Sequence, residues 1–315
     1  MRIHKISLAV AAGSLAIVSL ATPVSAQDAG KAQQVLAAAR KAIGDRKIDT
    51  LKTFIAEARV QRNVGTFQAS SDVEVYIDLP DKYARSEMPS GQMNFSSRQG
   101  FNGDRPLARA GRAGGGAFMV RMGPNGPEPI EKPTPEQEAE MAKMALRSAR
   151  HEASRMMLGW FAMAHPAMKA EYTYAGEAES ADGKAHVIDV KDGEGFAVRL
   201  FIDQQTNLPL MVTYQAPKRT IVGGGVRVQA GAPVVQQSQA QAPAAGGVET
   251  ARRAAAEPAQ LVEYRLYFAD WAEMDGIRFP QKIQRAVEGT PEEEWNVAKI
   301  KVNPKIDAKK FEAGS

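Results

Sequence analysis

The chain contains no cysteine among its 315 residues. Disulfide bonds are therefore excluded, and so is the acylated cysteine that tethers a bacterial lipoprotein to a membrane. Histidine is scarce, with 4 residues, and no two of them have the H-E-x-x-H or H-x-x-x-H spacing that places two imidazoles on one metal ion. The G-x-S-x-G motif of a serine nucleophile is also missing. We therefore expect no enzyme activity, no metal and no cofactor.

Neither sign of charge dominates, since 40 Lys and Arg face 36 Asp and Glu for a formal net charge of +4. A nearly balanced charge is poor evidence for nucleic acid, which we do not expect as a partner.

Long apolar runs are confined to the N-terminus. Basic Arg2 and Lys5 precede an apolar run from Ile6 to Ala21, and the small residues Ser25 and Ala26 follow. This pattern predicts a secretory signal peptide over residues 1–26, cleaved after Ala26. A retained membrane anchor is the alternative, but the run is shorter than the ~20 residues that span a bilayer. We expect a soluble periplasmic protein with no integral membrane segment after cleavage.

The rest of the chain is rich in stretches where apolar and polar residues alternate, which is the period of a β-strand. The first such strands are predicted over residues 53–61 and 73–79. Further strands are predicted over 82–88, 93–100, 169–174, 185–191, 196–202, 208–215, 261–268, 277–287 and 294–302. Turn signals throughout favour a mainly β fold, with a large curved antiparallel sheet or barrel rather than a βαβ arrangement.

Two segments have a helical period instead. Residues 31–43 carry an apolar stripe that ends at Gly44, which is typical of a short docking helix. Residues 135–164 form a longer amphipathic segment, with 6 of the chain's 13 methionines between Met141 and Met168. Because methionine adapts to irregular apolar shapes, we interpret this segment as a helical lid inserted at 134–165. An ordinary core helix is the alternative, since both have the same apolar stripe.

Two segments are predicted to be loops. Residues 111–116 are glycine-rich and basic but lack the Gly-Lys-Ser/Thr ending of a phosphate-binding loop. Residues 229–259 consist mainly of Ala, Gln, Pro, Gly and Val, which offer too little bulky apolar surface to offset the entropy of ordering. This low-complexity segment is predicted to be disordered, and an interaction segment is the alternative.

Two polar features are interpreted as solvated. Glu292, Glu293 and Glu294 could form a carboxylate cluster, but three consecutive residues at the start of a strand point in different directions. His151 stands among charged residues of the predicted lid. Both are expected to face water.

Most of the chain after residue 26 resembles a known family in its order of elements, and the likeness is specific in the last third. The residues that carry the likeness are Phe201-Ile202-Asp203, Thr206, Leu208-Pro209, Tyr264 to Phe268, Asp270, Asp275-Gly276 and Phe279-Pro280. They resemble the outer-membrane lipoprotein-sorting, or LolA-like, group of periplasmic proteins. The resemblance implies an unclosed half-barrel capped by helices and formed by residues 27–315 as a single domain. It also implies a carrier that shelters the acyl chains of lipid-modified proteins on their way to the outer membrane.

The candidate ligand-binding residues are the alternating apolar positions of the sheet and the apolar residues of the lid. They are Phe54, Val60, Val75, Ile77, Met141, Met156, Trp160, Met163, Val198, Leu200, Leu266 and Phe268. The expected function is binding of acyl chains or acylated protein cargo in an apolar trough. The alternative is a non-catalytic cell-envelope interaction protein that contacts protein partners through its surface loops. A third possibility is that the apolar residues simply fill a closed core.

Overall fold

The computed structural model describes residues 26–64, 67–90, 97–107, 120–123, 126–129, 133–181, 183–222, 225–228 and 260–312. The predicted signal peptide up to residue 25 and the two predicted loops, 111–116 and 229–259, lie outside these residues.

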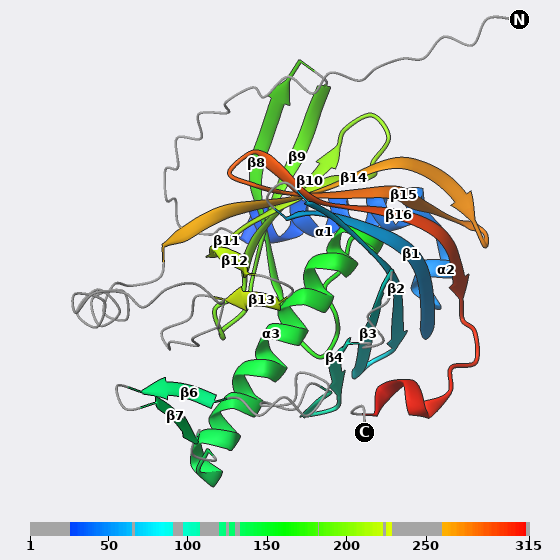
Figure 1. The fold of residues 1–315 in the computed structure, drawn as a ribbon. Coiled ribbons are helices and arrows are strands. Elements are labelled where there is room, and N and C mark those ends of the chain that lie inside the picture. The colour runs from blue at the N-terminus through cyan, green and yellow to red at the C-terminus, as the bar shows by residue number, and fades with distance from the viewer. Residues whose placement is uncertain are drawn as a thin grey trace, which may run out of the picture.

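Twelve strands form one sheet that curves around a long helix (Figure 1). In spatial order they are β5 (Arg105–Pro106), β4 (Ser97–Asn102), β3 (Lys82–Pro89), β2 (Phe67–Asp78), β1 (Thr53–Val64), β16 (Thr290–Val302), β15 (Ile277–Val287), β14 (Leu261–Met274), β11 (Pro209–Pro217), β10 (Ala197–Asp203), β9 (Gly183–Lys191) and β8 (Glu171–Ser180). Every neighbouring pair is antiparallel. The edge strands β5 and β8 lie at opposite ends of this order, so the sheet is an unclosed barrel. The predicted fold class is confirmed.

The remaining strands form two small hairpins outside the large sheet. They pair β6 (Val120–Gly123) with β7 (Gly126–Pro129) and β12 (Arg219–Val222) with β13 (Gly225–Val228). The sequence did not predict them or β5, because strands of two to four residues contain too few alternations to show a period.

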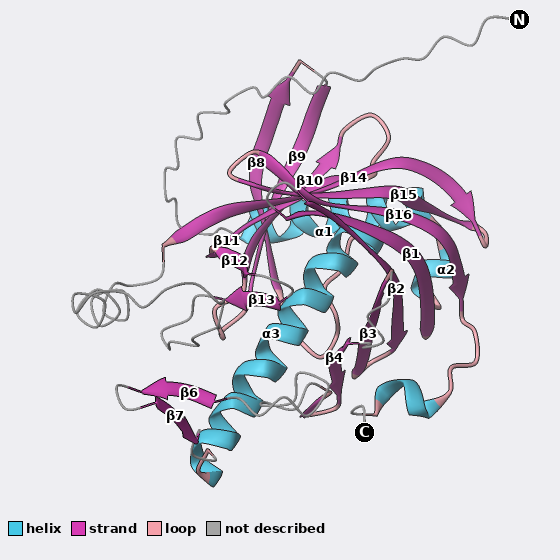
Figure 2. Ribbon diagram, in the orientation of Figure 1, coloured by secondary structure: helices cyan, strands magenta, loops and turns pink. Residues whose placement is uncertain are grey.

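The helices lie mainly on the inner side of the curved sheet (Figure 2). They are α1 (Ala26–Ile43), α2 (Arg46–Asp49), α3 (Pro135–Phe161) and the 3-10 turn η1 (Ala308–Phe311). Helix α1 packs on β8 and β15 through an apolar stripe that includes Leu36 and Ile43, both buried. Among the described residues, no helix is both long enough and apolar enough to cross a lipid bilayer.

Helix α3 begins and ends at well-formed caps. The side chain of Thr134 accepts a hydrogen bond from the backbone of Gln137, whose side chain accepts one from the backbone of Thr134 in return. The helix ends where Ala162 adopts a left-handed conformation with a φ of 52°. The helix is therefore three residues shorter than the predicted 135–164.

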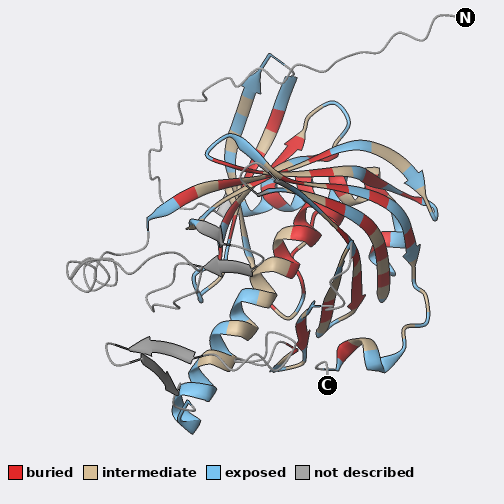
Figure 3. Cartoon of the chain, viewed as in Figure 1, coloured by how far each residue is buried: buried red, intermediate tan, exposed pale blue. Residues whose placement is uncertain are grey.

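The two halves of α3 have different environments (Figure 3). From Ala153 to Phe161 only Arg155 is not buried, whereas residues from Pro135 to Met144 are exposed or half-buried. Helix α3 contacts strands towards both ends of the strand order, namely β3, β4 and β5 at one end and β10 and β11 at the other. Trp160 and Phe161 join Phe54 and Phe279 in one aromatic cluster, with ring centroids 4.9 to 6.3 Å apart. The C-terminal half of α3 thus fills the concave face.

The turn residues that carry the family resemblance hold two hairpins. The Asp203 carboxylate accepts hydrogen bonds from the backbone nitrogens of Gln205 and Thr206 at 3.1 and 2.6 Å, which fixes the turn from β10 to β11. Asp275 and Gly276 have φ angles of 49° and 74° in the turn from β14 to β15. The Asp275 carboxylate also accepts from the Val302 nitrogen at 2.6 Å, which ties this turn to β16.

One glycine permits the close approach of α3 to the sheet. A Cβ atom at position 159 would lie 1.9 Å from Cζ of Phe268. We expect Gly159→Ala to lower the free energy of unfolding by about 1–3 kcal/mol, because the Phe268 ring must move within a packed core. The matched control is Gly30→Ala on α1, where a Cβ would meet nothing within 4 Å. It should raise the free energy of unfolding by about 0.5–1 kcal/mol. Urea denaturation of both variants checks the prediction, and equal effects would contradict it.

Candidate functional site

The predicted ligand-binding residues lie almost entirely in one apolar cluster between α3 and the concave face. Ten of the twelve are buried there: Phe54, Val60, Val75, Ile77, Met156, Trp160, Val198, Leu200, Leu266 and Phe268. Phe54, Ala56, Ala58 and Val60 of β1 are all buried, while Arg59 is exposed. The strand parity named in the prediction is therefore the one that faces α3.

The other two predicted residues lie at the margins of this cluster. Met163 follows the end of α3 and packs against the cluster while half-buried. Met141 lies in the exposed half of α3, is half-buried and is not a member of the cluster. The structure thus brings together the predicted residues from the C-terminal half of α3 and the sheet, and leaves Met141 outside.

A cavity of about 40 Å³ adjoins the apolar cluster. Ligand pockets have volumes of about 300–1,000 Å³, so this cavity does not hold an acyl chain as it stands. The apolar face is occupied by α3 itself. In this structure the C-terminal half of α3 packs as a core helix.

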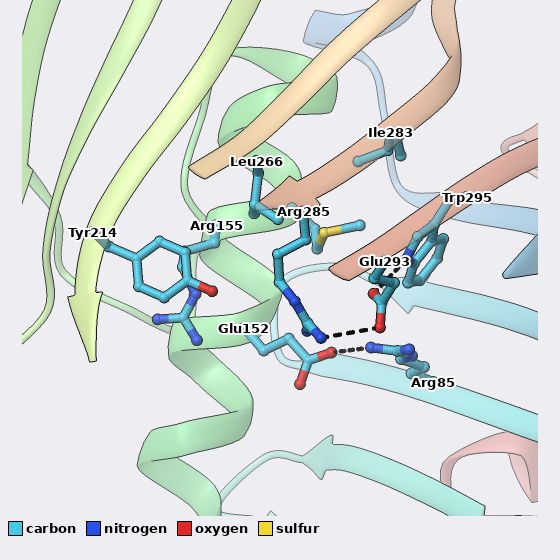
Figure 4. A pocket seen from close by; sticks show the side chains of 10 residues that line it. Arg85, Glu152, Arg155, Tyr214, Leu266, Ile283, Arg285, Glu293 and Trp295 are labelled. Atoms are coloured by element: carbon cyan, nitrogen blue, oxygen red, sulfur yellow. Dashed lines mark hydrogen bonds and ion pairs between the residues drawn. The ribbon is translucent and has the colours of Figure 1, made fainter. Parts of the chain in front are cut away.

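Charged side chains line one side of this cavity, where β3, β15 and β16 face α3 (Figure 4). Arg85 donates to Glu152 of α3 at 2.8 Å, and Arg285 pairs with Glu293 at 3.2 Å. Arg62 pairs with Glu293 at 2.6 Å and also with Glu87. Their side chains are 4 to 21% exposed. Buried charges are tolerated only when they are paired, and each of these has a partner. We call Arg62, Arg85, Glu87, Glu152, Arg285 and Glu293 the charged cluster.

Glu293 corrects the interpretation of the three consecutive glutamates as a solvated turn. It is 5% exposed, and Trp295 donates to its carboxylate at 2.6 Å. Although burial alone would raise its pKa, the nearby Arg285, Arg85 and Arg62 hold the pKa of Glu293 far below its usual range. Trp295 and Val297, two and four residues on, are also buried and share its face of β16. The two-residue spacing of Glu293, Trp295 and Val297 was the signal in the sequence that could have placed Glu293 on the concave face of the sheet.

Two arginines also stack on aromatic rings at the cavity. The guanidinium of Arg85 lies 4.6 Å from the ring centroid of Trp295, and that of Arg155 lies 4.4 Å from that of Tyr214. Arg155 comes from α3, whereas Arg85 lies on β3. Guanidinium groups therefore face the cavity from both the helix and the sheet.

The histidines do not gather at a metal site. Within the described ranges, no group of three His, Asp or Glu residues is placed to hold a metal ion. The expectation of a solvated His151 is wrong: its side chain is 15% exposed, packs against Phe196 and lies 3.5 Å from Asp192. Burial and nearby Arg155 lower the pKa of His151. His165 is fully buried just after α3, where its ring contacts Phe101 edge-on.

We expect Glu293→Gln to lower the free energy of unfolding by about 3–5 kcal/mol, because it removes the charge that compensates buried Arg285 and Arg62. The matched control is Glu294→Gln, which removes the 3.0 Å pair with half-exposed Lys282. It should cost less than about 1 kcal/mol. Chemical denaturation at pH 7 measures both variants. A small effect of Glu293→Gln would mean that the charged cluster does not depend on this carboxylate.

His165 should make the folded state sensitive to mild acid. Burial lowers the pKa of His165 to about 4, so the folded chain keeps its imidazole neutral. The unfolded chain, with a histidine pKa of about 6.5, binds a proton first, and stability is lost as the pH falls below that value. We expect a loss of about 2 kcal/mol between pH 7 and pH 5. His165→Asn should flatten this slope in denaturation curves, and an unchanged slope would assign it to another group.

No protein-family model and no curated protein sequence matches the chain. Three solved structures are similar to the chain, each at 9% sequence identity. A LolA superfamily protein from Nitrosomonas europaea has a TM-score of 0.45, with 89% of this chain and 96% of that one covered. A putative outer membrane lipoprotein-sorting protein domain from Vibrio parahaemolyticus has a TM-score of 0.43, with 90% and 97% covered. A DUF1329 family protein from Desulfovibrio piger has a TM-score of 0.41, with 89% and 97% covered.

Proposed function

We propose that this chain is a non-catalytic periplasmic protein that binds acyl chains, free or attached to protein cargo, on the concave face of its sheet. The observation that carries the proposal is the continuous apolar cluster between α3 and the sheet. Each methylene group removed from water contributes about 0.8 kcal/mol, so an acyl chain needs a lining of this kind to cross the periplasm. The predicted export signal and the likeness to lipoprotein-sorting proteins agree with this role.

Helix α3 is the element that an acyl chain would displace. Its buried half covers the concave face through Met156, Met157 and Trp160, among others, while its N-terminal half is exposed or half-buried. Apolar contacts are not directional, so an acyl chain can replace the apolar contacts that α3 makes with the sheet. The ion pair between Glu152 of α3 and Arg85 of β3 must break as the helix moves. We infer that α3 shifts outward as the chain enters, and that transfer to an acceptor reverses the shift.

The cell-envelope interaction protein is the second candidate. This alternative is motivated by residues 229–259 and by the basic Arg109-Arg112 loop, and both lie outside the described part of the chain. The acyl-chain proposal is preferred because described residues carry it.

Displacement of α3 can be measured with spin labels, because the chain has no cysteine of its own. Met144 of α3 and Leu261 of β14 are both 59% exposed and can be replaced by labelled cysteines. We expect the distance between these labels to increase by about the width of an acyl chain when dodecanol is added, because the helix must move to admit it. Pulsed electron paramagnetic resonance reads the distance, and native mass spectrometry counts the bound ligand.

The matched control is a label pair on the sheet alone, at Met88 of β3 and Leu261, which are 62% and 59% exposed. This distance should stay constant. Ligand-free protein at saturating dodecanol, with no change in either distance, would overturn the proposal. If dodecanol binds but the distance from Met144 to Leu261 does not change, the acyl-chain site stands and α3 is not the element that covers it.

A further inference from the structure

Helix α3 lies between the two ends of the strand order and contacts strands at each of them (Figure 1). It contacts β3, β4 and β5 at one end and β10 and β11 at the other. When α3 shifts outward, a gap can therefore form at the β3–β5 end or at the β10–β11 end. The polar contacts of α3 with the two ends differ, and this difference indicates which side opens.

The contacts with the β3–β5 end are close. In the turn between β4 and β5, the Asp104 carboxylate accepts a hydrogen bond from Arg150 of α3 at 2.7 Å. The guanidinium of Arg150 also lies 5.8 Å from the ring centroid of Phe101, which is fully buried on β4. His165, just after α3, contacts the same ring edge-on at a centroid distance of 5.0 Å. Two separate points of the helical segment thus rest on one residue of β4.

His165 is fixed in this position by its own hydrogen bonds. Its Nδ1 accepts from the backbone nitrogen of Ala167 at 3.1 Å, so the proton of the neutral ring is on Nε2. Nε2 faces the carbonyl oxygen of Lys82 on β3 at 3.4 Å. The C-terminal end of α3 is therefore attached to both β3 and β4.

The contacts with the β9–β10 turn, residues 192–196, are longer. Arg147 of α3 lies 3.8 Å from Glu194, and their side chains are 53% and 63% exposed. Water and salt screen such a pair, so it adds little to the stability of this arrangement. His151 lies 3.5 Å from the Asp192 carboxylate. Because burial and nearby Arg155 lower the pKa of His151, its ring is neutral at pH 7 and this contact is not an ion pair.

Two other contacts of α3 do not distinguish the ends. At the β10–β11 end the guanidinium of Arg155 lies 4.4 Å from the ring centroid of Tyr214, which matches the ring contact of Arg150 at the other end. The ion pair between Glu152 and Arg85 joins the helix to the concave face itself. It breaks when the helix leaves that face, on whichever side the gap forms.

We propose that acyl chains enter between α3 and the β9–β10 turn, and that α3 turns about its contacts with β4 as they enter. The inference rests on the proposed function, because it gives the route to the same acyl-chain site. The contacts of Arg147 and His151 separate in this movement, whereas those of Arg150 and His165 persist. Residues 192–196 then border the entrance, and residues 101–104 form the hinge.

Covalent cross-links test the route, because the chain has no cysteine of its own. One variant carries Arg147→Cys and Glu194→Cys at the entrance, and the matched control carries Arg150→Cys and Asp104→Cys at the hinge. Each cysteine pair is joined by bismaleimidoethane or, for comparison, capped with N-ethylmaleimide. Native mass spectrometry confirms the cross-link and counts the dodecanol bound to the whole protein.

We expect the cross-link at the entrance to abolish dodecanol binding, because the helix can no longer separate from the turn. The capped form of the same variant should bind dodecanol, since the loss of an exposed ion pair leaves the gap free to open. The cross-link at the hinge should leave dodecanol binding intact, because it joins two residues that stay together.

Hydrogen exchange of the unmodified protein checks the same route without any substitution. When dodecanol is bound, the backbone amides of residues 192–196 should exchange faster, because the contacts of His151 with Asp192 and Phe196 are lost. The amides of residues 102–105 should exchange at an unchanged rate. If a cysteine variant does not fold, this exchange pattern decides.

The outcomes separate the route from the proposed function. Dodecanol binding by the form cross-linked at the entrance, or loss of binding in the form cross-linked at the hinge, would overturn the route and leave the acyl-chain site standing. Faster exchange at residues 102–105 in place of 192–196 would do the same. Failure of the unmodified protein to bind dodecanol would overturn both.

Discussion

The packing of the last turns of α3 into the concave face is the interaction on which the rest of the structure depends. A sheet that curves but does not close has an apolar inner face, and that face must be covered. Phe54, Phe279 and Phe268 come from three different strands and meet Trp160, Phe161 and Gly159 of one helix. These contacts join three strands from the middle of the sheet to one helix, so α3 completes the core there.

The charged cluster has a different physical role from the apolar packing beside it. Burying several ions in one place removes them from water, which costs free energy. Attraction between well-placed partners offsets this cost but adds little net stability. Replacing the cluster by apolar residues could give a sheet at least as stable, so a requirement for folding alone does not explain it.

Much of the fold could be predicted because local patterns and tertiary structure agree there. In β1, apolar Phe54, Ala56, Ala58 and Val60 face the core as the period of two requires. Thr134 and Gln137 mark the start of α3 by a capping box that is visible in the sequence. Where a pattern was short or its residues polar, prediction failed. Glu293 looked like part of a solvated charge run, and only the strand period shared with Trp295 pointed inward.

By itself the sequence determined the strand periods, the amphipathic helix and the absence of disulfide bonds, since each follows from residue types at close spacing. It could not decide whether α3 is a lid or a core helix, because both present the same apolar stripe to a sheet. The tertiary structure placed the buried half of α3 on the concave face and left the other half exposed. It also brought Arg62, Arg85, Arg285 and Glu293 together from four strands. The pairing of residues more than 200 positions apart depends on the order of strands in the sheet, which no local pattern encodes.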